Sequence, residues 1–280
     1  MIFVIKMIKM INMIKRKLYQ VDAFTDKLFG GNPAAVCPLE KWLDDALMQK
    51  IAMENNLAET AFYVKQDKFY EIRWFTPKVE VDLCGHATLA AAFVLFHHEG
   101  HTEDVIHFHS PRSGALNVYR NADWLTLDFP ADTISEVAIS GDFVQCFNRK
   151  PVEVYKGKSD YMFLFEQEAD ISNATPRFDT IAQLDARGLI ITAKGNQVDF
   201  VSRFFAPQVG VMEDPVTGSA HTTLTPFWAK RLNKNPLSAI QWSERKGYLQ
   251  CRVEGDRVKI SGQAKLYLTG EIYIDLNYRT

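Results

Sequence analysis

Three ionisable side chains stand in surroundings that suit acid–base chemistry. Glu59 lies among small and apolar residues at the expected start of a strand, and a carboxyl in such surroundings can carry a proton near neutral pH. His86 stands at the expected start of a helix, where the helix dipole favours a neutral imidazole. Asp214 precedes a second expected helix start. The alternative interpretations are structural: an exposed acid, a core histidine and a helix cap.

Each of the two helix starts carries a glycine beside a small polar residue. Gly85 follows Cys84, and Gly218 stands between Thr217 and Ser219. A helix N-terminus presents unpaired N–H groups that bind anions, and glycine lets a ligand approach the backbone closely. Two such helix ends facing one space would bind a carboxylate without an arginine. We therefore expect these residues to bind a carboxylate-bearing substrate, although a plain turn is the alternative for either glycine alone.

A repeated segment precedes both helix starts. Residues 73–81 read RWFTPKVEV and residues 203–211 read RFFAPQVGV, with five of nine positions identical at a constant offset of 130. Three extra residues separate the second copy from its glycine. Chance can produce a nine-residue match, but the shared continuation into glycine and small polar residues favours duplication. The sequence thus predicts two copies of one unit.

The elements that position these residues follow from hydrophobic periodicity. Alternation predicts strands over 18–24, 61–64, 69–75, 105–109, 115–119 and 124–129, and again over 152–155, 161–165, 189–192 and 198–205. Helical spacing predicts a helix over 43–55. Apolar runs predict one buried helix in each copy, over 87–96 and over 220–232, with Pro226 bending or ending the second.

Many strands with few helices predict an α+β fold, in which each half is a curved sheet around one central helix. A nucleotide-binding βαβ fold would need regularly alternating helices and a glycine-rich G-x-G-x-x-G loop, and the sequence has neither. We expect an N-terminal extension over 1–17 outside the core, a first half over 18–131 and a second half over 132–280. The last strand could return to the first half.

Composition narrows the function classes. The 280 residues carry a formal net charge of −2 and no basic stripe, so nucleic acid is not an expected partner. The four cysteines are widely spaced, which predicts free thiols, a reducing cytoplasm and no metal site. Lys6 and Lys9 interrupt the apolar N-terminal run, so neither a membrane span nor a secretory signal is expected there.

Five segments resemble the phenazine-biosynthesis isomerase-like family. They read DAFT at 22–25, GNPAAV at 31–36, NLAETAF at 56–62, LCGHATLA at 83–90 and EDPVTGSAH at 213–221. The likeness runs from about Leu18 to the C-terminus and is strongest to the branch that contains the MAWD-binding protein. It implies the diaminopimelate-epimerase-like fold, with two pseudo-symmetric halves, each a barrel-like and mostly antiparallel sheet around a central helix. The active site would lie in the cleft between the halves.

The resemblance also implies a reaction. The catalytic glutamate of the family corresponds to Glu59, its polar partners to His86 and Asp214, and its carboxylate-binding backbone to the segments around Gly85 and Gly218. Glu59 would move a proton between two carbons without a cofactor, first as base and then as acid. The expected partners are a small carboxylate substrate and a second copy of the chain in a homodimer.

Two alternatives differ in class. Related epimerases and racemases use a thiol before each central helix, whereas this chain has Cys84 at one position and Thr217 at the other, which argues against two-base racemisation. Cys84 alone could serve a one-base dehydratase or epimerase, because a helix N-terminus can lower a thiol pKa. A non-catalytic binding protein on the same fold is the third interpretation.

Overall fold

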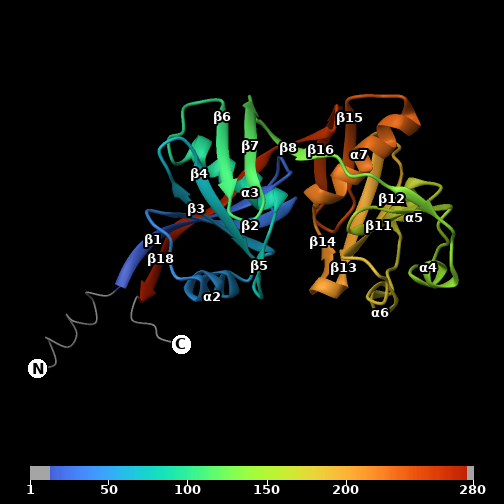
Figure 1. Cartoon of the computed structure of the whole chain (residues 1–280), viewed down its shortest axis with the longest axis horizontal. Helices are drawn as coiled ribbons and strands as arrows, with labels where there is room; N and C mark the ends of the chain where they lie inside the picture. Colours follow the sequence, from blue (N-terminus) through green and yellow to red (C-terminus); the bar gives the residue numbers. More distant parts are fainter. Residues whose placement is uncertain (1–12, 276–280) are drawn as a thin grey trace, which may run out of the picture.

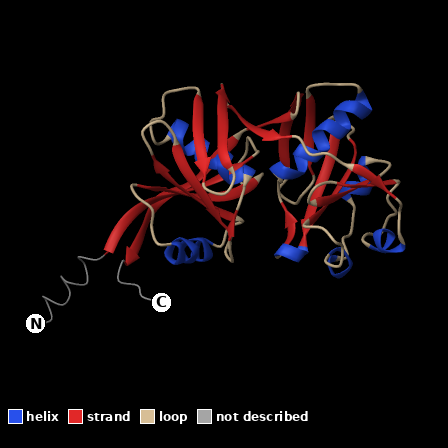
Figure 2. Cartoon of the chain, viewed as in Figure 1, coloured by secondary structure: helices blue, strands red, loops and turns tan. Residues whose placement is uncertain are grey.

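Two sheet-rich halves lie side by side and are joined by strands that pass between them (Figures 1 and 2). The computed structural model describes residues 13–275. In the first half, β1 spans Met13–Ala23, β2 Asn32–Leu39, α2 Asp45–Asn55, β3 Glu59–Lys65, β4 Tyr70–Phe75, β5 Glu80–Val81, α3 Gly85–His97, β6 Val105–Ser110, β7 Gly114–Asn121 and β8 Trp124–Pro130.

The second half repeats this plan with extra short helices. Its elements are β9 Ser135–Val137, α4 Gly141–Gln145, β10 Glu153–Lys156, β11 Asp160–Leu164, α5 Glu168–Ser172, α6 Phe178–Ile181, β12 Gly188–Lys194, β13 Phe200–Ala206, η1 Pro207–Val209, β14 Val211–Asp214, α7 Gly218–Leu232, β15 Leu237–Gln241, β16 Gly247–Glu254 and β17 Arg257–Gly262. The last strand, β18 Ala264–Asp275, pairs with β1 in the first half. The short helices α4, α5 and α6 were not predicted, because four or five residues give too little periodicity to recognise.

The strands form one continuous path of pairings. It runs β18–β1–β2–β3–β4–β6–β7–β8–β17–β16–β15–β13–β12–β11–β10–β9, while β5 pairs with β4 and β14 with β13. Most pairs are antiparallel, and parallel pairs occur at matching places in the two halves: β2–β3 and β11–β12, then β4–β6 and β13–β15. The α+β architecture predicted from the sequence is confirmed.

Each half wraps its sheet around one helix. Ten of the residues of α3 are buried, in keeping with its apolar sequence, and α3 packs against β1, β2, β3 and β8. The corresponding helix α7 packs against β15, β16 and β17 and continues through Pro226. Proline removes one helical donor, and the carbonyl of Thr222 that is left without it accepts a bond from the Asp132 backbone N–H at 3.2 Å. This substitute donor explains why the proline does not end the helix.

The repeated segment has the same role in both halves. Arg73 on β4 forms a bidentate pair with Glu80 at 2.7 and 2.9 Å, and Arg203 on β13 forms the same pair with Glu213 at the same two distances. The three extra residues lie in the turn that contains η1. After that turn, equivalent residues of the two halves differ by 133 in number. Val81 and Val211 are therefore identical in the sequence repeat but do not occupy equivalent places in the structure.

The C-terminal strand lies in the first half. β18 pairs antiparallel with β1 from Met13↔Asp275 to Ala23↔Ala264, and β17 pairs with β8. Figure 1 shows these last strands, in red, crossing between the halves. Residues 13–17 of the expected extension belong to β1, because β18 is long enough to pair with them; residues 1–12 lie outside the described part of the chain. Among residues 13–275, no helix has the length and hydropathy needed to cross a membrane.

Candidate active site

The structure brings Glu59, His86 and Asp214 together from three separate elements. Glu59 is the first residue of β3, His86 the second of α3 and Asp214 the last of β14. His86 Nε2 lies 3.1 Å from Glu59 Oε2, and the side chains are 5% and 16% exposed. The two atoms are at ion-pair distance but are not aligned for a hydrogen bond, so both are buried polar atoms without a hydrogen-bond partner in residues 13–275. Such a pair can contact a third group placed beside it.

Asn32 links His86 to Asp214, and sequence reasoning gave it no role. Its Nδ2 lies 2.7 Å from Asp214 Oδ1, 3.0 Å from the Val216 carbonyl oxygen and 3.1 Å from His86 Nδ1. The carboxylate and carbonyl accept only, which fixes this atom as the amide nitrogen. The only available signal was the motif Gly31-Asn32-Pro33, which lies within the GNPAAV segment at 31–36.

The neighbouring carboxylate decides the charge of His86, whose Nε2 faces Glu59 Oε2. Burial lowers the pKa of His86, but nearby negative charge outweighs it and holds the pKa well above 6.5. We attribute this rise to the Glu59 carboxylate, because the neighbouring Cys84 is a neutral thiol at neutral pH. The neutral imidazole expected from the helix dipole alone is therefore wrong.

Asp214 is held by donors from both halves. Besides the bond from Asn32, its Oδ2 accepts from the Thr217 hydroxyl at 2.6 Å, and its backbone carbonyl accepts from Gln241 Nε2 at 2.7 Å. Removal from water raises its pKa to about 6; Glu59 adds to the rise, while His86 and these hydrogen bonds oppose it. A carboxyl with this pKa can hold or release a proton near neutral pH.

Cys84 and Thr217 occupy equivalent positions, immediately before α3 and α7. Burial, and then the charge of Glu59, raises the pKa of Cys84 to about 11. The lowered thiol pKa expected from the helix N-terminus is wrong, because removal from water dominates. Thr217 is a hydrogen-bonding residue: its hydroxyl donates to Asp214 and accepts from Gln241 Nε2 at 3.1 Å.

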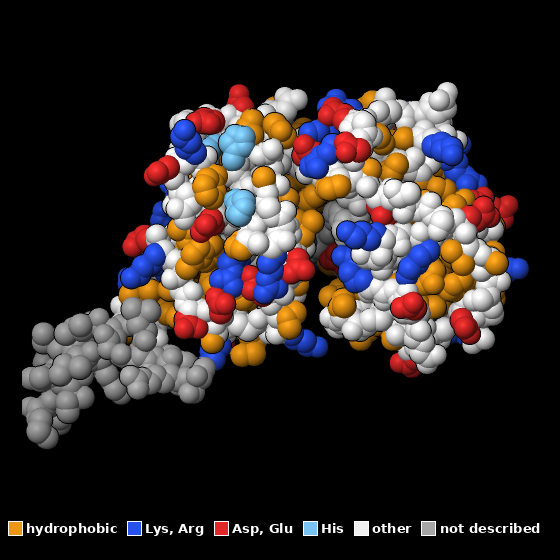
Figure 3. Space-filling model, in the orientation of Figure 1, with side chains coloured by type: hydrophobic (Ala, Val, Ile, Leu, Met, Phe, Trp, Pro, Cys, Tyr) orange, Lys and Arg blue, Asp and Glu red, His pale blue; other side chains and the backbone are white. Residues whose placement is uncertain are grey.

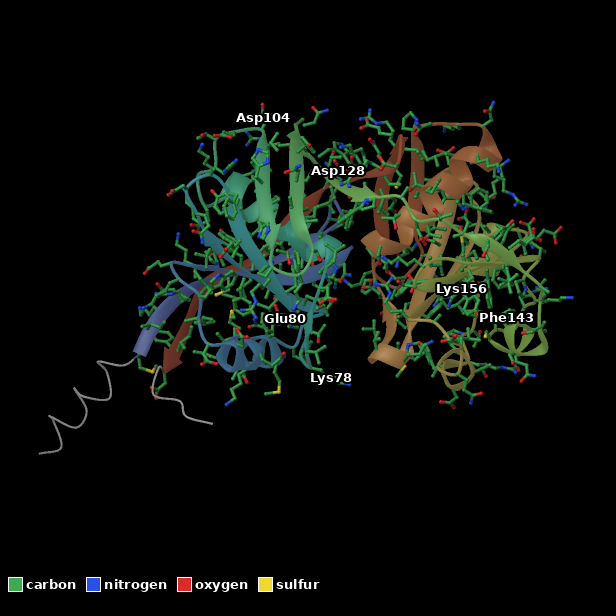
Figure 4. All side chains as sticks on the ribbon, viewed as in Figure 1. Lys78, Glu80, Asp104, Asp128, Phe143 and Lys156 are labelled. Atoms are coloured by element: carbon green, nitrogen blue, oxygen red, sulfur yellow. The ribbon has the colours of Figure 1, made fainter. Side chains whose placement is uncertain are left out.

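The two glycines approach each other closely. A Cβ built on either Gly85 or Gly218 would lie 3.4 Å from the Cα of the other, so the N-termini of α3 and α7 meet at this point. Figure 3 shows a groove between the two halves on the face that it presents. In Figure 4, Lys78 lies on the turn after β4, next to the second half. Its Nζ is 3.1 Å from the Cβ position of Gly210, which follows β13.

Matching side chains brace the two helix starts. The Thr88 hydroxyl donates to the Cys84 carbonyl at 2.6 Å, and His221 Nδ1 contacts the Thr217 carbonyl at 2.8 Å. His221 is fully buried, and burial lowers its pKa to about 4, so it is neutral and donates from Nδ1. Both residues were present in the quoted motifs, but their sequence positions alone do not distinguish a brace from a core residue.

One group of side chains has the donor types of a metal site. Glu59, Cys84 and His86 offer ligand atoms within 4.8 Å of one another. These are the facing side chains of Glu59 and His86 and the neighbouring thiol. The expectation of no metal stays a prediction.

Sequence and structure comparisons identify relatives over almost the whole chain. The family described as phenazine biosynthesis-like protein matches residues 21–270. An uncharacterized isomerase of Pseudomonas aeruginosa is 51% identical over 257 residues, covering 92% of this chain and 98% of its own. The human phenazine biosynthesis-like domain-containing protein is 38% identical over 291 residues, covering 92% and 99%.

Solved structures agree. A PhzF-family phenazine biosynthesis protein of Enterococcus faecalis has a TM-score of 0.91 and 48% identity, covering 93% of this chain and all of its own. A probable proline racemase of Agrobacterium radiobacter has a TM-score of 0.63 at 8% identity, covering 92% of each chain, and shares the fold alone. The epimerase-like fold expected from the sequence is confirmed, and this chain belongs to the phenazine biosynthesis-like (PhzF) family.

Proposed function

We propose that this protein is an isomerase in which Glu59 moves a proton between two carbons of a small carboxylate-bearing substrate. The observation that carries the proposal is the meeting of Glu59 and His86, whose facing atoms lie 3.1 Å apart, are buried and have no hydrogen-bond partner within residues 13–275. The two atoms compensate each other's charge, but neither makes an aligned hydrogen bond, and buried hydrogen-bonding capacity left unused costs free energy unless a ligand satisfies it. A substrate bound in the groove between the halves would do so.

The other residues have supporting roles. The N–H groups at Gly85 and Gly218 would bind the substrate carboxylate and stabilise charge that develops next to it. Glu59 would take the proton as base and return it to the second carbon as acid. His86, with its Nε2 facing Glu59, and Asp214, with a pKa of about 6, would interact with polar substituents as charge shifts. Asn32 keeps both side chains oriented.

The one-base thiol mechanism has less support. Nucleophilic or basic cysteine acts as thiolate, and Cys84 is buried with a pKa of about 11. A thiol in that state is neutral at pH 7. Cys84 is therefore placed as a neighbour of His86, with its Sγ 3.5 Å from Nδ1.

The test starts with a search for ligands among small carboxylic acids by thermal shift. Each acid that binds is then incubated with the protein in heavy water, and double-bond migration and deuterium uptake are followed by NMR. We expect Glu59→Gln to lower the isomerisation rate about 10²–10⁴-fold, because general acid–base catalysis contributes that much. Binding of the acid should persist, because the helix ends are unchanged.

Glu54→Gln is the matched control, since it makes the same chemical change at an exposed position on α2. It should keep the wild-type rate. Full activity of Glu59→Gln would exclude the glutamate mechanism. Stabilisation by acids with neither isomerisation nor deuterium uptake would instead support the non-catalytic binding protein.

A further inference from the structure

The two halves carry opposite charges at corresponding places. Trp74 on β4 pairs with Ala61, and the equivalent Phe204 on β13 pairs with Ile190. The correspondence between β3 and β12 therefore has an offset of 129, which matches Glu59 with residue 188. The second half has a glycine there, and Arg187 stands immediately before it.

Gly188 occupies the backbone position equivalent to Glu59, and the neighbouring Arg187 supplies the charged side chain. A Cβ on Gly188 would lie 2.4 Å from Phe204 Cζ, so this position has no room for a side chain directed that way. Arg187 supplies the side chain instead, and its guanidinium lies 5.5 Å from the Phe204 ring centre. Glu59 thus places a carboxyl group beside the start of α3, and Arg187 places a positive charge beside the start of α7.

Asp160 fixes the orientation of Arg187. Its carboxylate accepts from Nε at 3.0 Å and also from Nη2, which uses one edge of the guanidinium. The Asp160 side chain is 6% exposed, whereas that of Arg187 is 42% exposed. The anchored edge thus contacts a buried carboxylate, the side chain as a whole is partly exposed, and Nη1 has no hydrogen-bond partner among residues 13–275.

The guanidinium of Arg187 lies beside the predicted carboxylate-binding backbone. Nη2 also donates to the Ser219 hydroxyl at 3.0 Å. Ser219 is the second residue of α7 and corresponds to His86 on α3. The arginine therefore stands where the catalytic acid stands in the other half, next to the helix N-terminus.

We propose that Arg187 binds a second carboxylate of the substrate, so that this site prefers small dicarboxylic acids to monocarboxylic ones. The inference rests on the proposed function for the place of the first carboxylate, at the two helix ends. Those ends suffice for one anionic group, and the guanidinium of Arg187 adds a positive charge and the two N–H donors of Nη1, which suit a second one. Asp160 keeps the guanidinium preorganised, and its single negative charge leaves the Nη1 donors available.

The experiment measures ligand preference without turnover. Dissociation constants of benzoate and of the three benzenedicarboxylates, which differ in the spacing of their carboxylates, are determined by titration calorimetry. In the wild type, at least one dicarboxylate should bind about tenfold or more tightly than benzoate. Arg187→Gln should abolish that preference and change the benzoate dissociation constant less than threefold.

Arg231→Gln is the matched control. Arg231 also forms a bidentate pair with one carboxylate, that of Glu153, and its side chain is 41% exposed. It lies 13 residues after Gly218 on α7, about 20 Å along the helix. This variant should keep the wild-type preference, whereas Arg187→Lys should retain part of it, because lysine keeps the charge but loses the planar fork.

Three results would overturn the inference: no dicarboxylate preference in the wild type, no binding of any of the four acids, or an equal loss of mono- and dicarboxylate binding in Arg187→Gln. The last would mean that Arg187 only supports the helix start through Ser219. Glu59→Gln separates the two proposals, because it should abolish isomerisation and leave the dicarboxylate preference intact.

Discussion

At the scale of single residues, the raised pKa of Asp214 makes the stability of the fold depend on pH. Its pKa is about 6 in the folded protein and near 3.8 when solvated. The native state therefore binds this proton more tightly than the unfolded chain, and the resulting stability is present at pH 4 and lost as the pH rises to 7. We expect Asp214→Asn to remove about 2 kcal/mol of this pH dependence.

The measurement is the free energy of urea unfolding of wild type and Asp214→Asn between pH 4 and 7. The two proteins are compared by the slope of the unfolding free energy against pH. Its absolute value is not compared, because the substitution also weakens the bonds from Thr217 and Asn32 and so shifts the whole curve. Parallel profiles for the two proteins would show that Asp214 titrates normally.

Single residues also show what the sequence can predict. Glu59, His86 and Asp214 could be named because each lies in a motif of distinctive length, and the structure does place them together. Asn32 could not be given a role, because its three contacts come from residues 54, 182 and 184 positions away. A helix N-terminus can lower a thiol pKa, but burial raises that of Cys84, and the depth of burial is not visible in the sequence.

At the scale of elements, the starts of α3 and α7 use different residues for one task. Thr88 and His221 each bond the carbonyl of the residue before the helix, Cys84 or Thr217. The elements themselves were predictable, because buried helices of 13 and 15 residues give long apolar runs. The shared role of Thr88 and His221 was not predictable, because a threonine and a histidine look unrelated until the two helices are superimposed.

His221→Thr tests this correspondence, since it installs the residue that the other half uses. The folded pKa of about 4 lies below the ordinary 6.5, so His221 contributes stability at pH 7 that is lost as the pH falls towards 4. Between pH 7 and pH 5, protonation of His221 should lower the unfolding free energy of the wild type by about 2 kcal/mol, and the variant should not show this loss.

Denaturant unfolding at the two pH values measures this loss. At pH 7 the variant should be less stable by about 1–3 kcal/mol, because the smaller side chain leaves a cavity. An equal acid sensitivity of the two proteins would contradict the assignment of His221 as a buried neutral base.

At the scale of the whole molecule, the halves meet at Gly85 and Gly218. A single methyl at either position would lie 3.4 Å from the opposite Cα, which is a tight but tolerable contact. Two methyls together would compete for the same space. We expect Gly85→Ala and Gly218→Ala each to cost about 1 kcal/mol or less, and the double variant to cost at least about 1 kcal/mol more than their sum.

A double-mutant cycle of unfolding free energies measures this coupling. Additive effects would mean that the two helix ends do not press against each other in solution. The duplication behind this contact was visible as a repeat in the sequence. The domain boundaries at residues 17 and 131 stay predictions, because strands cross between the halves.

The return of β18 to β1 sets the order in which the molecule can be completed during synthesis. Strands joined by a short turn, such as β7 and β8, can pair as soon as both are made, but β1 must wait for a partner about 250 residues later in the chain. Such non-local pairing is slow and leaves an open strand edge meanwhile. The first half therefore stays unfinished on the ribosome until the final strand emerges, and a nascent chain stalled before residue 264 would expose β1 to chaperones and proteases.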